Sequence, residues 1–237
     1  MRRRTINRGL GEILVVVVGI LLAFGVDSLW QRAQDRRLGS EIVSGLVTSF
    51  EANRAELETW VGRRRDKLAA THELLLVVTQ QASAIPPDSV AALLRSLRSY
   101  QGFDSNDSRL REVLASGRMH LIRGGELRAR LSGWEAKYQD LRGVEDLARQ
   151  HSMQVVDAWL NERIPVTGGP GRYDPVPPRP LGESDVRLLR TLEFENLLRQ
   201  QYFLDRLADG RGTSLLQEMD VVLRLLGDET DSAATAF

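Results

Sequence analysis

Apolar and polar positions follow helical spacing over most of the chain, and no segment shows a clear period of two, the mark of a β-strand. The strongest signal lies near the N-terminus. Residues 13–26 contain no charged side chain, and the wider stretch of residues 10–30 is mostly apolar. As one helix, residues 10–30 would be about 31 Å long. The hydrocarbon core of a bilayer is about 30 Å thick. The pattern therefore predicts a transmembrane helix over residues 10–30.

The flanks of this stretch are typical of a single membrane span. Glu12 and Asp27 lie near its two ends, where carboxylates can reach the headgroups, and Trp30 suits the aromatic belt as an interface anchor. Residues 1–9 form a basic head with four arginines, against three arginines between residues 32 and 37. This excess favours a cytoplasmic N-terminus. We therefore expect an inner-membrane protein with the bulk of its chain outside the cytoplasm.

Two other interpretations of the N-terminus stay open. A basic start, an apolar stretch of about 12 residues and the small residues Ala23 and Gly25 also fit a cleaved signal peptide. Against this, the apolar stretch runs directly into a helical pattern without a break. The remaining interpretation is a buried helix of a soluble protein.

Beyond the span, the periodicity predicts three long and two short helices, and hence an all-α fold with an elongated bundle over residues 31–227. The first long helix follows the span over residues 28–84, and Pro86 and Pro87 end it. Asp88 and Ser89 cap a short helix. The second short helix covers residues 107–116, and Gly117 ends it.

The clearest helical pattern covers residues 127–159. Its seam residues are spaced alternately by four and three: Leu127, Leu131, Trp134, Tyr138, Leu141, Glu145, Ala148, Ser152, Val155 and Trp159. Because two of these residues, Glu145 and Ser152, are polar, the seam indicates a globular packing face with a wet patch. An isolated coiled coil is disfavoured.

The last long helix is expected to begin at Ser184 or Asp185, after a Pro/Gly-rich loop over residues 164–183, and to end at Gly227. Residues 228–237 are expected to form a flexible tail. The apolar residues predicted to face the core are Leu189, Leu192, Phe203, Leu207, Leu215, Met219 and Val222.

Composition excludes several classes of function. The 237 residues include 32 Lys and Arg and 32 Asp and Glu, so the basic excess of a nucleic-acid binder is missing. Without cysteine there can be no disulfide, thiolate metal site or cysteine nucleophile. His72, His120 and His151 do not form a His-Glu-x-x-His pair. We therefore expect no catalytic, cofactor or metal site.

Two further segments carry weaker signals. The run Arg63–Arg65 is interpreted as a solvated helix face. The segment Pro175–Pro180 is interpreted as a stiff connector, with recognition by an aromatic groove as the alternative.

Two stretches resemble a known family. Gly11-Glu-Ile opens an apolar run that contains Gly19-Ile-Leu-Leu-Ala23 and leads to Trp30. A second stretch, residues 110–138, contains Leu-Arg-Glu-Val-Leu-Ala-Ser-Gly-Arg-Met-His-Leu-Ile and later Trp134-x-x-x-Tyr138. Together, about a third of the chain resembles a family of uncharacterised bacterial membrane proteins with one N-terminal span and a helical domain. The exit of the span, residues 25–30, departs from the amides of that family. The resemblance implies a bacterial single-span protein and carries no established activity.

These observations favour a membrane-anchored helical module that binds a partner protein or assembles with itself and has no chemistry of its own. Gly19 and Ala23 form a small-xxx-small pair that, with Gly11 and Glu12 on or near the same flank, lets a second helix approach in lipid. Glycine is also common in spans without such a role. The alternative function is a periplasmic ligand-sensing bundle that signals through a separate membrane protein. An enzyme that uses carboxylates and arginines is the third hypothesis.

Overall fold

A computed structural model describes the backbone of residues 2–81, 85–165 and 179–234, and the side chains of these ranges between residues 18 and 231. Within this part the chain forms helices and irregular connections without a β-strand, which confirms the all-α prediction. Residues 166–178 of the predicted Pro/Gly-rich loop, including most of the segment Pro175–Pro180, and residues 235–237 of the expected tail lie outside the described residues.

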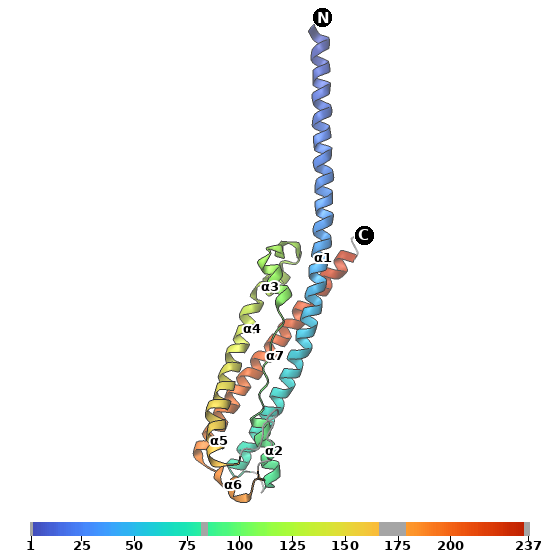
Figure 1. The fold of residues 1–237 in the computed structure, drawn as a ribbon. Helices are drawn as coiled ribbons and strands as arrows, with labels where there is room; N and C mark the ends of the chain where they lie inside the picture. The colour runs from blue at the N-terminus through green and yellow to red at the C-terminus, as the bar shows by residue number, and fades with distance from the viewer. Residues whose placement is uncertain (1, 82–84, 166–178, 235–237) are drawn as a thin grey trace.

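The helices pack as a long rod built mainly from α1, α4 and α7 (Figure 1). α1 and α4 run in the same direction along the rod, and α7 returns beside both of them. The N-terminal part of α1 projects far beyond the other helices (Figure 1). In chain order the elements are α1 (Arg2–Val78), α2 (Pro87–Leu97), α3 (Ser108–Ala115), the 3-10 turn η1 (Arg118–Leu121), α4 (Gly125–His151), the π-helical turn η2 (Ser152–Val156), α5 (Asp157–Arg163), α6 (Glu183–Leu188) and α7 (Leu192–Ala234).

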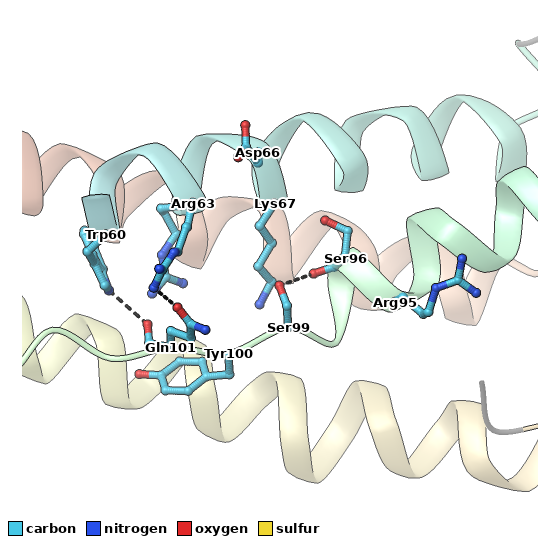
Figure 2. Close-up of a pocket in the computed structure, with 10 residues that line it drawn as sticks. Trp60, Arg63, Asp66, Lys67, Arg95, Ser96, Ser99, Tyr100 and Gln101 are labelled. Carbon is cyan, nitrogen blue, oxygen red and sulfur yellow. Dashed lines mark hydrogen bonds between the residues drawn. The ribbon is translucent and has the colours of Figure 1, made fainter. Parts of the chain in front are cut away.

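Residues 98–107, here called the connecting segment, run from α2 to α3 along the bundle between α1 and α4 (Figure 2). Side chains of both helices hold this extended backbone. Asn53 on α1 accepts a hydrogen bond from the Asn106 amide at 2.9 Å and donates one to the Asn106 carbonyl at 3.3 Å. Trp134 on α4 donates through Nε1 to Asp107 at 3.0 Å. These bonds supply the partners that an extended segment cannot find in its own backbone.

The buried apolar residues form two clusters, one at each end of the bundle. The first lies nearer the projecting end of α1 and includes Leu46, Phe50, Leu131, Trp134, Met219 and Val222. The second lies at the opposite end and includes Leu74, Leu94, Val156, Trp159, Phe194 and Leu198. Along α1 the first cluster ends at Val61 and the second begins at Leu74. The hydrophobic core is therefore interrupted in the middle of the bundle.

The first helix begins at Arg2, before the predicted span, and ends earlier than its sequence predicts. α1 continues without interruption from the apolar N-terminal stretch into the bundle, and it stops at Val78, well before Pro86. Gln80 takes a left-handed conformation with φ 59° just after the helix. The prediction that the prolines end α1 is wrong, and so is the predicted cap by Asp88 and Ser89, because Pro87 opens α2 at its first position.

The seam of α4 is buried as predicted up to Ser152, with Tyr138 half-buried, but its phase then shifts by one residue. η2 is a π-helical turn, which adds a residue to one turn of the helix. As a result Val156 is fully buried, whereas the predicted seam residue Val155 is exposed. Trp159 returns to the core on α5. The heptad pattern could not reveal this insertion, because its spacing assumes an unbroken α-helix.

The predicted last helix is two helices. α6 begins after Gly182, and the Asp185 carboxylate accepts the Gly182 amide hydrogen at 2.8 Å. The helix is interrupted at residues 189–191. The Thr191 hydroxyl accepts the Phe194 amide hydrogen at 3.2 Å near the start of α7. α7 also continues past Gly227 to Ala234, into the predicted tail.

The predicted inner face of α7 is right only in part. Leu189, just before α7, and Leu215, Met219 and Val222 are buried. Leu192, Phe203 and Leu207 are exposed. The residues that face the bundle interior in this part of α7 are Phe194, Leu198, Gln201, Asp205 and Ala208. A search for apolar residues cannot select an inner face that contains a glutamine and an aspartate.

A close contact between α1 and α7 depends on Gly212, where a Cβ would overlap the Trp60 ring. We expect Gly212→Ala to lower the free energy of unfolding by about 1–3 kcal/mol, because the buried indole must move. At Gly210 an added Cβ would have no neighbouring atom within 4 Å. The matched change Gly210→Ala should therefore raise the free energy of unfolding by roughly 0.5–1 kcal/mol, because alanine has the higher helix propensity. Urea denaturation of the full chain in detergent measures both. Equal effects of the two changes would show that the close contact is not needed.

Candidate functional site

In the gap between the two apolar clusters, α1, α4 and α7 all bury polar side chains. We call this set the polar layer. Its members are Arg64, Lys67, Thr71, Glu145, His151, Gln201 and Asp205. Buried ionic and amide groups are costly unless they are paired, so their hydrogen bonds decide how the helices meet here.

Asp205 on α7 is at the centre of the polar layer and is completely buried. Its carboxylate accepts a hydrogen bond from Arg64 Nη1 at 2.5 Å and lies 3.6 Å from Lys67 Nζ. Gln201 donates to the same carboxylate at 2.9 Å, and its amide oxygen accepts a hydrogen bond from His151 Nδ1 at 2.9 Å. One carboxylate thus compensates two cations from the neighbouring α1.

Glu145 on α4 forms the second anionic centre of the polar layer. Its Oε1 accepts hydrogen bonds from Trp60 Nε1 at 2.8 Å and from the Phe103 amide at 3.3 Å, and lies 3.6 Å from Arg64 Nη2. Burial raises the pKa of this carboxyl group, and the Arg64 charge opposes part of the increase. Glu145 therefore connects α1, α4 and the connecting segment.

Lys67 is the least satisfied member of the polar layer. Its residue is only 4% exposed, yet Nζ has no hydrogen-bond partner in the described part of the chain. Removal from water lowers the pKa of this ammonium group, whereas the Asp205 charge raises it. An ammonium group carries three donors, so this amine can accommodate further acceptors.

A cavity of about 490 Å³ opens beside Lys67 (Figure 2), and we call it the basic cavity. Figure 2 shows the Lys67 side chain extending from α1 toward the connecting segment, while Asp66 points to the opposite side of the helix. Two groups of residues line the basic cavity. α1 contributes Trp60, Arg63, Arg64, Asp66 and Lys67, and α2 and the connecting segment contribute Arg95, Ser96, Ser99, Tyr100 and Gln101. The volume is within the range of small-molecule sites.

Aromatic rings stack around the cationic wall of this cavity. The Arg64 guanidinium lies 4.7 Å from the Trp60 ring centroid and 5.9 Å from that of Tyr100. Arg149 on α4 lies 5.9 Å from the Tyr100 ring centroid. These contacts hold the rings in place, so that the cavity has preformed walls.

A second cavity, of about 550 Å³, lies where α1 leaves the bundle. Charges of both signs line it, including Asp35, Arg36, Arg123 and Glu229. Glu229 already accepts hydrogen bonds from the Arg123 and Gly124 amides at 2.8 and 3.3 Å, and so covers the start of α4. Its lining contains no counterpart of the unsatisfied Lys67 amine among the described side chains. The basic cavity is therefore the stronger candidate.

The predicted span residues lie on the projecting part of α1, away from the basic cavity. Gly19 has open space around it, and Ala23 and Trp30 are exposed. The side chain of Glu12, like that of every residue before position 18, lies outside the described residues, and the same applies to the surroundings of Gly11. Where side chains are described, no helix combines the length and hydropathy needed to cross a membrane. Residues 10–17 of the predicted span lie outside that range.

The sequence identifies Glu145 as a polar member of the seam but does not indicate its partners. Arg63 and Arg65 are exposed as predicted for a solvated helix face, whereas that prediction is wrong for the buried Arg64. A signal was present: Arg64 continues the α1 spacing of Leu57, Trp60 and Val61, and Asp205 lies one turn after Gln201 on the inner face of α7. Hydrophobicity alone conceals this pattern, because the buried positions are charged.

Replacing Asp205 tests the pairing at the centre of the polar layer. We expect Asp205→Asn to lower the free energy of unfolding by roughly 3–5 kcal/mol, because two buried cations lose their shared carboxylate. Asp209→Asn, one turn later on α7, is the matched control. Asp209 pairs with Arg65, whose side chain is 60% exposed, so the expected loss is below about 1 kcal/mol. Chemical denaturation measures both, and a similar loss for the two variants would contradict the assigned role of Asp205.

The described side chains contain no group of three or more His, Cys, Asp or Glu residues that could hold a metal ion. Comparisons of the chain with protein-family models, curated proteins and solved structures find no match. The resemblance to bacterial single-span membrane proteins therefore stays a prediction, and function has to be argued from the geometry.

Proposed function

We propose that the protein is a membrane-anchored helical module, in which α1 holds the bundle at a bilayer and mediates assembly with a second copy or another membrane protein. The observation that supports this proposal is the exposure of every large apolar side chain on α1 between residues 18 and 30. Their exposed fractions are 46–68%: Val18, Ile20, Leu21, Leu22, Phe24, Val26, Leu29 and Trp30.

An exposed apolar surface of this kind needs a cover. These side chains point to all sides of the helix, so that packing against one neighbouring helix would leave most of them in water. Contiguous apolar patches on proteins in water rarely exceed a few hundred Å². Lipid covers a helix on all sides, and residues 10–17 extend the same apolar sequence toward the N-terminus. The family resemblance and the excess of arginines before the span support a bacterial inner membrane as the proposed location, with the N-terminus inside and the bundle outside the cytoplasm.

The continuity of α1 gives the anchor a mechanical role. One helix carries both the exposed apolar residues and Arg64 and Lys67 of the polar layer. A displacement or rotation of α1 in the membrane is therefore coupled to the packing of α1 against α7 in the bundle. Assembly through α1 would use the small residues Gly19 and Ala23, because neither prevents a second helix from approaching closely.

Membrane retention tests the anchor. We expect the full chain to stay with membranes through a carbonate wash, and Leu21→Arg with Leu22→Arg to release most of it, because each arginine costs about 2.5–3.5 kcal/mol in the middle of a span. Leu188→Arg with Leu192→Arg changes two leucines that are also exposed but lie on the bundle, and should leave retention unaffected. Release of the unmodified chain, or a mature N-terminus near Val26, would refute the anchor.

Disulfide crosslinking tests assembly. Because the sequence contains no cysteine, only the introduced cysteines can form the crosslink. Val26 lies on the same helical face as Gly19 and Ala23, whereas Ser28 lies on the opposite face at nearly the same depth. In membranes we expect Val26→Cys to form dimers at least about fivefold faster than Ser28→Cys, and Gly19→Ile to abolish the difference by separating the helices. Equal rates for both cysteines would argue against assembly through this face.

The basic cavity favours a second candidate function, in which the bundle senses a small ligand and passes the signal through α1 to a membrane partner. In this case ligand binding beside Lys67 is the input and the position of α1 is the output.

A further inference from the structure

Position along α1 distinguishes the second cavity from the basic cavity. We call it the membrane-proximal cavity, and its lining on α1 begins at Asp35 and Arg36, five and six residues after Trp30. At about 1.5 Å per residue, these two residues lie roughly 8–9 Å beyond the predicted interface anchor. The headgroup layer on one side of a bilayer is about 5–8 Å thick. The opening of this cavity therefore lies at or just outside the headgroups if α1 is anchored as proposed.

Three parts of the chain form the walls of the membrane-proximal cavity. The lining residues on α1 recur at spacings of three and four, so they share one face of the helix. η1 and the residues after it contribute a second wall, and the end of α7, which lies beside α1 (Figure 1), contributes a third. A Cβ added at Gly39 would lie 3.0 Å from the Leu121 carbonyl oxygen, so η1 packs directly on α1 near the opening.

Charges of both signs line this cavity, and three of them lack a partner in the described part of the chain. The side chains of Arg36, Arg123 and Asp35 form neither an ion pair nor a hydrogen bond there. Glu229 differs, because its two oxygens already accept the Arg123 and Gly124 amide hydrogens at 2.8 and 3.3 Å. Two guanidinium groups and one carboxylate therefore remain for a ligand.

These three charges match a ligand that carries both a phosphate and a primary ammonium group. Guanidinium groups bind phosphate oxygens through charge-assisted hydrogen bonds. A carboxylate accepts hydrogen bonds from an ammonium group, and the Ser40 and Ser44 hydroxyls on the same face of α1 as Asp35 are further acceptors. Val43 and Leu121 add apolar surface for the carbon atoms of the ligand. A bilayer supplies such a ligand at the level of the opening, as the headgroup of phosphatidylethanolamine.

We propose that the membrane-proximal cavity binds the headgroup of a phosphatidylethanolamine lipid, with Arg36 and Arg123 donating hydrogen bonds to the phosphate and Asp35 accepting them from the ammonium group. This inference rests on the proposed anchor, since only an anchored α1 brings the opening to the headgroups. A cavity of about 550 Å³ has room for one headgroup. The lipid contacts α1 and the segment after η1 together, and so holds the membrane end of the bundle at a fixed distance from the bilayer.

Native mass spectrometry of the full chain in detergent tests the proposal by titration with lipids that have the same acyl chains. We expect one phosphatidylethanolamine to bind at least about fivefold more tightly than phosphatidylcholine, because the quaternary ammonium of choline has no N–H to donate to Asp35. Phosphatidylglycerol, which lacks the ammonium group, should also bind at least about fivefold more weakly. Equal affinities for the three lipids would overturn the proposal.

Substitutions of exposed residues, which should keep the fold, locate the headgroup. Arg36→Gln and Arg123→Gln should each weaken phosphatidylethanolamine binding about tenfold, since each removes a charged donor to the phosphate. Arg32→Gln is the matched control, because Arg32 is one helical turn nearer the membrane but does not line the cavity, and its affinity should stay within twofold. Asp35→Asn should remove the preference over phosphatidylcholine and leave phosphatidylcholine binding within twofold.

Two outcomes would contradict the assignment. An equal loss of affinity in Arg32→Gln and Arg36→Gln would overturn the location, because general attraction to headgroups would then account for the binding. Phosphatidylglycerol that binds more tightly than phosphatidylethanolamine, with no effect of Asp35→Asn, would overturn the headgroup class. A carbonate wash of membranes that contain the unmodified chain separates this inference from the anchor. Retention without selective lipid binding overturns the headgroup site alone, whereas release overturns the anchor.

Discussion

The structure depends on one buried carboxylate, that of Asp205, which compensates two cations of α1. This carboxylate accepts a hydrogen bond from Arg64 at 2.5 Å and also faces Lys67. It therefore fixes the register of α7 relative to α1. Buried ion pairs add little net stability, because desolvation offsets most of the attraction. Their loss is costly, however, so any sliding of α7 along α1 that separates these charges is disfavoured. Asp205 thus acts mainly on the register of the bundle.

The polar layer also shapes the molecule around it. Since charged residues occupy the middle of the interface, the apolar core divides into two clusters, and the connecting segment crosses this level as extended backbone between α1 and α4. The Glu145 carboxylate accepts hydrogen bonds from the Trp60 indole and the Phe103 amide, and so holds this segment against the two helices. The basic cavity lies where the helix surface and the extended segment cannot fill the space between them.

The two proposals meet on α1. Its exposed apolar residues end near Trp30, and Lys67 lies roughly 55 Å further along the same helix. A ligand bound beside Lys67, as in the second candidate function, would act on the helix that carries the proposed anchor. This arrangement would link the basic cavity to the proposed anchor, and the link is physical because both lie on one uninterrupted helix.

The sequence by itself determined the helical fold, the seam of α4 with its polar members, and the apolar stretch at the N-terminus, because each is a periodic or local property of neighbouring residues. Gly117 also ends its helix as predicted, with φ 69°. The tertiary structure alone decided the burial of Arg64, the role of Asp205, the π-helical shift at η2 and the break between α6 and α7. A charged side chain is buried only where its partner arrives from elsewhere, and Arg64 and Asp205 are 141 positions apart in the chain. No local pattern records such a pairing.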